Sequence, residues 1–253
     1  RGTDSNMVIS QNEITDNFGR GIYIHHNYAT DSAVTITDNL IKGNSKEGIA
    51  AMARDGGNIT ISSNQIISNQ GGGVKARGSN SNPASYINVT NNIIHGNSGV
   101  WGAIISIDQK RSSTGGTELS VTATGNSITG SSGSSGSSLF YITNSSGSLN
   151  TITPTIINNN SLNNDTTYWI YTGKNAGTDT VNLENNWWGT TSDVEMQAKV
   201  HDWNDDASKG LVDYTPFLTA PNTTAPPSPP QNIAAQTGPT SISLTWDANP
   251  EAD

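Results

Sequence analysis

The chain of 253 residues contains no cysteine, and charged residues make up only 13% of it. A disulfide framework and a cysteine-ligated metal site are therefore excluded. Lys and Arg number 12 against 21 Asp and Glu, and the net charge of -9 argues against nucleic acid as a partner. No apolar run approaches the roughly 18 residues of a membrane-spanning helix, so we expect no membrane insertion.

The abundant residues are Asn, Ser, Thr, Gly, Ile and Val, a mixture that favours strands and turns. A unit of about 25 to 34 residues recurs about seven times in this background. One Asn in each copy marks the alignment: Asn12, Asn39, Asn64, Asn92, Asn126, Asn160 and Asn186. A repeat of this size is typical of a solenoid, in which each unit buries its apolar face against its neighbours.

The register inside the copies predicts how the chain coils. Positions five before, three before and two after each marker are nearly all aliphatic, and in the sixth copy they are Thr155, Ile157 and Leu162. Residues spaced by two share one face of a strand, so we expect these positions to face inward. In the first three copies a Gly leads a third strand: Gly21, Gly48 and Gly73. Three short strands per turn predict a parallel β-helix. The marker Asn residues would lie at corners, where Asn tolerates the left-handed backbone and its amide bonds the next coil.

Repeats such as residues 59–69 resemble those of the right-handed parallel β-helix, or pectate-lyase-like, superfamily, over roughly residues 4–186. The resemblance implies an all-β fold, a right-handed single-stranded helix of about seven coils, which we assign to residues 1–190. It implies no single activity, because lyases, hydrolases, epimerases, adhesins and copper-maturation proteins share this architecture.

Residues 130–138 (GSSGSSGSS) are of low complexity, and we expect a flexible extruded loop there. Residues 191–219 are predicted to cap the solenoid. Ser192 and Glu195 fit a helix capping box, and a helix beginning there would cover the open end of the core. The side chains expected on its inner side are Val194, Met196, Val200 and Trp203.

Residues 220–230 form a Pro- and Thr-rich segment, which we interpret as a semi-rigid, extended linker. Residues 231–253 resemble the first two strands of a fibronectin type III domain, with Trp246 as its core Trp. That sandwich needs about 90 to 100 residues, so we expect this incomplete fragment to be poorly ordered in isolation. The chain begins at Arg1 without an initiator Met, so we interpret it as a piece of a longer multidomain protein. Separately, we expect it to be a monomer and to be secreted or on the cell surface.

The third-strand face is the best candidate site. Alternation points Tyr23, His25, Lys75 and Arg77 outward, as a basic and aromatic cluster in an acidic protein. The resemblance implies an acidic glycan along this face, where a cation neutralises a uronate and a base removes a proton. The catalytic candidates are His25, Lys75 and Arg77, and the substrate-binding candidates are Tyr23, Arg54, Asp108, Lys110 and Arg111. The alternative is a solvated face with scattered charges.

No metal or cofactor is predicted. Calcium-dependent lyases need clustered carboxylates, whereas this face offers only Asp55 and Asp108. Residues 201–206 are rich in oxygen ligands but lack the spacing of an EF-hand. The adjacent His25 and His26 point to opposite sides of a strand, and the paired carboxylates of a glycosidase are missing.

The leading hypothesis is therefore an extracellular β-helix that interacts with polysaccharide, with lyase or epimerase chemistry left open. The rival is a non-catalytic spacer or adhesin rod. A third alternative is ice binding through a Thr-rich ladder on the outer side of the first strands: Thr35, Thr37, Thr60, Ser62, Asn88, Thr90, Thr122 and Thr124.

Overall fold

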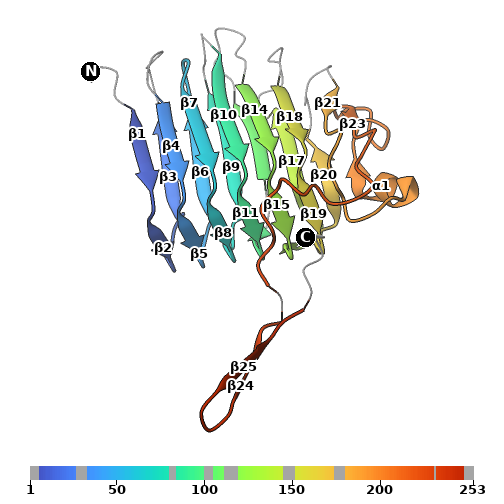
Figure 1. Ribbon diagram of the computed structural model, residues 1–253. Helices are drawn as coiled ribbons and strands as arrows, with labels where there is room; N and C mark the ends of the chain where they lie inside the picture. The colour runs from blue at the N-terminus through green and yellow to red at the C-terminus, as the bar shows by residue number, and fades with distance from the viewer. Residues whose placement is uncertain are drawn as a thin grey trace.

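Three long parallel sheets run along a rod in the computed structural model (Figure 1), which describes residues 6–26, 33–79, 84–99, 105–110, 119–144, 152–173, 180–230 and 232–247. The first sheet contains β1 (Met7–Ser10), β4 (Ala33–Thr37), β7 (Asn58–Ser62), β10 (Ser85–Thr90), β14 (Leu119–Thr124), β18 (Ile152–Ile157), β21 (Val181–Asn182) and β23 (Val212–Asp213). The second contains β2 (Glu13–Thr15), β5 (Leu40–Lys42), β8 (Gln65–Ile67), β11 (Ile93–His95), β15 (Ser127–Thr129) and β19 (Asn160–Leu162). The third contains β3 (Ile22–His26), β6 (Ile49–Ala53), β9 (Val74–Ser79), β13 (Ile105–Lys110), β17 (Ser138–Asn144), β20 (Tyr168–Thr172) and β22 (Val200–His201).

The chain visits the three sheets in turn, so the predicted parallel solenoid is confirmed. The chain forms six triplets of strands, from β1–β2–β3 to β18–β19–β20. The predicted count of seven coils is not confirmed, because the last copy adds β21 and, among the described residues, no strand of the second sheet. Among the described residues no coil covers the outer side of the N-terminal turn, and Met7 of β1 is 46% exposed.

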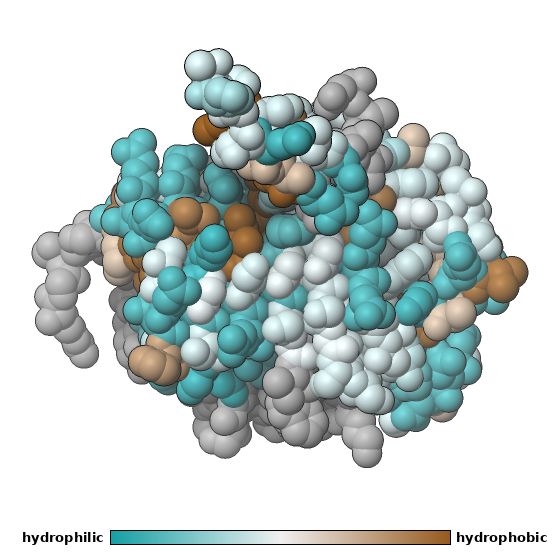
Figure 2. All heavy atoms as spheres, turned by 90° about the horizontal axis from the view of Figure 1, so that it is seen from below, coloured by the Kyte–Doolittle hydropathy of each residue, from teal (hydrophilic) through white to brown (hydrophobic). Residues whose placement is uncertain are grey.

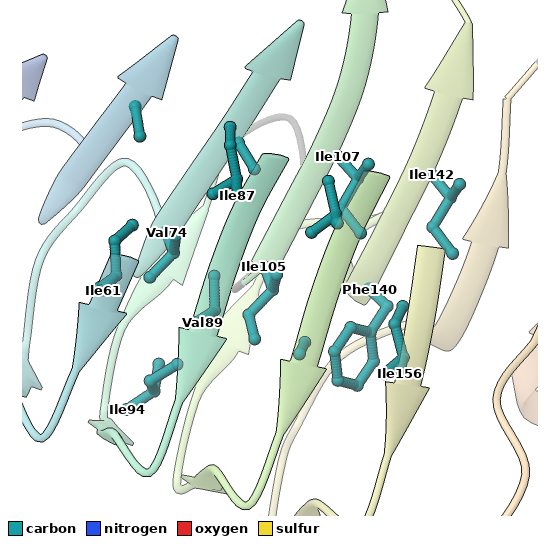
Figure 3. Close-up of a cluster of buried hydrophobic side chains, with 14 of the residues drawn as sticks. Ile61, Val74, Ile87, Val89, Ile94, Ile105, Ile107, Phe140, Ile142 and Ile156 are labelled. Carbon is teal, nitrogen blue, oxygen red and sulfur yellow. The ribbon is translucent and has the colours of Figure 1, made fainter. Parts of the chain in front are cut away.

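The core fills the space between the sheets with aliphatic side chains stacked coil on coil (Figure 3). Ile36, Ile61 and Val89 occupy one register position on neighbouring strands of the first sheet, and none of the three is accessible to solvent. Glycines stand where the corner approaches the next coil. A Cβ on Gly48 would lie 2.6 Å from Cγ2 of Ile66, which is why this position excludes a side chain.

Amide ladders line two corners. Asn39 donates from Nδ2 to Oδ1 of Asn64 over 2.9 Å, and Asn64 repeats this bond to Asn92 over 3.0 Å. The residue with positive φ stands just before the ladder Asn, as at Ser63 (φ 55°), rather than at the Asn itself. The second ladder was missed in the sequence. It lies five residues further on and includes Asn17, Asn44, Asn69 and Asn97.

The sixth marker is wrong by one residue. Asn126 bonds to Asn159 rather than Asn160, over 2.8 Å, and this shift turns Ile156 and Pro154 inward in place of Ile157 and Thr155. Residue 161, not Leu162, then pairs with Ile128. Residues 158–160 are all Asn, so the sequence does not show which of them is the marker. The pairing with the preceding coil identifies it as Asn159.

The Gly/Ser segment is not an extruded loop. Its residues 132–133 form β16 (Ser132–Gly133), which pairs with β12 (Ser98–Gly99) in a short sheet of its own. Ser131, Ser137 and Ser138 are almost completely buried. Residues 134–136 form an exposed turn between these buried serines, and the small side chains permit the close packing on either side of it.

The predicted cap helix is α1 (Asp193–Lys199), and Oγ of Ser192 accepts a hydrogen bond from the Glu195 amide. Only part of its predicted inner side is correct: Met196 and Val200 are buried, whereas Val194 is 77% exposed and Trp203 is 53% exposed. The cap core is completed by Trp188, whose ring meets those of Phe140 and Trp169. β23 then closes the first sheet beside β21.

Tyr214 closes the outer side of the cap. Its hydroxyl donates to Oδ1 of Asp193 over 3.0 Å. Burial, together with this bond, raises the pKa of Tyr214 to about 12.

The Pro-rich segment folds back onto the rod instead of leaving it directly. We call residues 222–228 the strap; it crosses β19 and β15 (Figure 1). After it, β24 (Ala234–Thr237) and β25 (Ile242–Thr245) form an antiparallel hairpin that projects away from the solenoid. Every residue of these two strands is exposed, including Ile242 and Leu244.

Candidate functional site

Two rows of outward side chains run along the third sheet. The strand register places Tyr23, Ala50, Lys75, Ser106, Tyr141, Tyr171 and His201 in the first row. The second row contains His25, Met52, Arg77, Asp108 and Thr143. The predicted residues Tyr23, His25, Lys75, Arg77 and Asp108 therefore share one face, at a spacing of about 4.8 Å per strand.

The remaining predicted residues lie at the edge of this face. Arg54 follows β6, and its Nε lies 3.2 Å from Oδ2 of Asp55. Lys110 is the last residue of β13. Arg111 lies outside the described residues.

Acidic side chains accompany the cations of this face. Glu47 receives two of them: its Oε2 lies 2.9 Å from Nε of Arg20, and its Oε1 lies 3.6 Å from Nζ of Lys75. In the second row, Oδ2 of Asp108 lies 3.5 Å from Nε of Arg77. Asp108 was predicted to contact substrate, but its position shows that it also neutralises the neighbouring cation. Lys75 and Arg77 are therefore held in place, and each is already paired with a carboxylate.

The aromatic groups lie at both ends of the first row. Tyr23 is 56% exposed near one end, and Cζ of Arg20 lies 5.2 Å from the centre of its ring. Towards the cap, the rings of Tyr141 and Tyr171 stack at 5.5 Å, and His201 stacks on Tyr171 at 4.9 Å.

Sequence reasoning missed this second aromatic cluster. Nζ of Lys209 lies 2.9 Å from the hydroxyl of Tyr171 and adds a cation to it. Tyr141 and Tyr171 are in register with Tyr23 through the strand pairing, although they lie further along their own strands. Coil lengths that change before β17 and β20 hid that equivalence.

The described ranges contain no group of three or more His, Cys, Asp or Glu side chains arranged to hold a metal ion. None of the helices in the described part of the chain has the length and apolar character needed to cross a bilayer. The groups that the outer side of the third sheet offers to a ligand are thus cations, carboxylates, hydroxyls and aromatic rings, as described above.

Residues 2–56 match a family model described as a right handed beta helix region. No curated protein and no solved structure matches the chain. The matched segment covers β1 to β6, and the same three-strand pattern continues beyond it through β20. The match and the stacked parallel sheets together indicate a right-handed β-helix repeat protein.

Proposed function

We propose that this domain binds an acidic polysaccharide along the outer side of the third sheet. The observation that carries the proposal is the first row, in which Tyr23, Lys75, Tyr141 and Tyr171 lie in register along the rod. A linear glycan is an extended ligand that repeats along its length, as does this row. Aromatic rings suit the apolar faces of sugars, and Lys and Arg suit their carboxylates.

Binding without chemistry is the activity that this arrangement supports best. A lyase needs a cation free to neutralise the uronate and a base beside it. Here Glu47 and Asp108 compete with a substrate carboxylate for Lys75 and Arg77. The same ion pairs favour the rival function, a rod that only separates or presents other modules, because paired surface charges need no ligand.

Binding assays on the whole chain separate the two. Retention in affinity gels containing polygalacturonate, alginate or a glycosaminoglycan should exceed retention in neutral glycan gels and should weaken with salt. Tyr23→Ala and Lys75→Ala should reduce retention, while Lys42→Ala, an exposed Lys on β5 of another sheet, should not. Glu47→Gln should strengthen retention, because it releases Arg20 and Lys75 from their shared partner.

Equal migration in all gels would refute glycan binding and leave the spacer. Ultraviolet absorbance of unsaturated uronate, followed in the same incubations, tests for lyase activity separately. An increase in this absorbance would show that the domain is a lyase and does more than bind the glycan.

The proposed setting is extracellular or at a cell surface, within a longer multidomain chain. Residues 231–253 would begin a fibronectin type III module, and the exposed Ile242, Leu244 and Trp246 of the hairpin are the residues that such a sandwich would bury. We also propose that the β-helix is of the pectate-lyase-like type.

A further inference from the structure

A single row of outward residues runs beside the first corner across the whole second sheet. Successive pairings place Glu13, Leu40, Gln65, Ile93, Ser127 and Asn160 in register, and we call these residues the corner row. The strap lies over its last two members, and Ser127 and Asn160 are completely buried. No segment of the described part of the chain covers the first three members in the same way, and Glu13 and Gln65 are exposed.

The strap is held mainly by bonds to its backbone. Asn160 donates from Nδ2 to the Asn222 carbonyl over 3.0 Å, and its Oδ1 accepts from the Asn222 amide over 2.7 Å. Ser127 donates from its hydroxyl to the Pro226 carbonyl. Short polar side chains of the corner row thus receive the carbonyls of an extended, Pro-rich segment, which is ordered at little entropic cost.

The uncovered part of the row forms a cavity of about 380 Å³ at the equivalent place in the first three coils. Its lining repeats the positions that hold the strap: Gln11, Asn12, Glu13, Asp38, Asn39, Leu40, Ser63 and Gln65. Asp38 is the equivalent of Asn158, whose carbonyl accepts from Asn222. Gln11 and Gln65 supply amide donors for carbonyls, and Leu40 between them offers an apolar floor. Figure 2, which views the molecule from below, shows hydrophobic atoms at the surface among hydrophilic ones.

We propose that this cavity is a docking site for an extended, proline-rich peptide that carries a basic residue. Because the lining repeats the register positions that hold the strap, an occupant with the extended backbone of the strap fits the cavity. The carboxylates of Glu13 and Asp38 argue for its charge, because they replace the neutral Ser127, Asn158 and Asn160 of the covered half. The strap itself has no charge, so a partner protein is favoured over the strap of a second copy.

The test titrates the full chain with two synthetic peptides and follows amide signals by NMR. One peptide has the sequence of residues 225–230, and the other has the same sequence flanked by Lys. Shifts should centre on residues 11–13, 38–40 and 63–65. The Lys-flanked peptide should bind about tenfold more tightly, an advantage that salt should reduce.

Variants decide whether the cavity is responsible. Leu40→Arg should weaken binding of the Lys-flanked peptide by about tenfold or more, by removing the floor and repelling Lys. Ile67→Arg is the matched control, since Ile67 is a partly exposed outward residue of the same sheet that does not line the cavity. Thermal melts of both variants verify folding, and both should retain any glycan binding of the third sheet.

Three results would overturn the proposal. The first is the absence of shifts at millimolar peptide, and the second is equal binding by Leu40→Arg and Ile67→Arg. The third is a response of the same signals to an oligouronate but not to the peptides, which would make the cavity a glycan site.

Discussion

At the scale of single residues, buried amides hold this molecule together. Asn64 is 1% exposed, and its Nδ2 donates to the carbonyls of Ile36 and Ser62 and to Oδ1 of Asn92. Its own Oδ1 accepts from Asn39. No other side chain of this size both donates and accepts in this way, so each Asn satisfies backbone groups that the corner leaves without a strand partner.

Asn64→Asp should therefore destabilise the fold strongly. The substitution keeps the shape of the side chain but removes two donors and buries a carboxylate beside carbonyl oxygens. We expect the free energy of unfolding to fall by about 3 kcal/mol or more, measured by urea denaturation. Asn58→Asp makes the same change at an exposed position of β7 and should cost little. Equal losses in the two variants would contradict a structural role for the ladder.

At the scale of elements, the cap closes a core that would otherwise end in open strand edges. α1 contributes few residues to this task, because only Met196 of the helix is completely buried. The remaining cover comes from Trp188, Val200 and Val212, which belong to the corner and to the strands on either side of the helix. The helix is thus a small part of the seal, and one side chain accounts for most of its contribution.

Met196→Ala should lower the free energy of unfolding by about 2–5 kcal/mol, because it leaves a cavity against the aromatic end of the core. Val194→Ala, two residues away in the same helix, should change it by no more than about 0.5 kcal/mol, since Val194 is mostly exposed. Denaturant titration of both variants measures the difference. A similar cost for both would mean that burial of Met196 does not anchor the cap.

At the scale of the whole molecule, the strap and the hairpin behave as different kinds of tail. The strap buries Ala225 and Ser228 and bonds to three positions on the rod. The hairpin buries none of its strand residues, and a two-stranded hairpin by itself is marginally stable. Poor order of residues 231–253 in isolation therefore remains a prediction. The Pro-rich segment before them, in contrast, is attached to the rod through the strap.

Two truncations test this distinction. A chain ending at Gln231 should keep the melting temperature of the solenoid, because the strands it loses, β24 and β25, bury none of their residues. A chain ending at Pro221 should lose about 1–2 kcal/mol of stability, because Ser127 and Asn160 give up the bonds to the strap. Calorimetry on both truncated chains measures these melting temperatures and unfolding free energies. An unchanged melting temperature in the shorter chain would show that the strap does not stabilise the rod.

The sequence by itself determined the solenoid, its three strands per turn, the inward positions of every copy but the sixth, the first amide ladder and a cap helix beginning after Ser192. These features depend on contacts between equivalent positions of neighbouring copies, so a repeating sequence displays them directly. It also placed Tyr23, Lys75 and Arg77 on one face, since alternation along a strand is a local property.

Only the tertiary structure decided which side chains meet between coils of unequal length. It selected Asn159 over Asn160, paired Lys75 with Glu47, brought Tyr141 and Tyr171 into the row of Tyr23, and laid the strap on Ser127. The physical reason is that corners and loops absorb insertions without changing the stacking of strands. Once the coils differ in length, the number of residues between two positions therefore no longer predicts whether their side chains are neighbours.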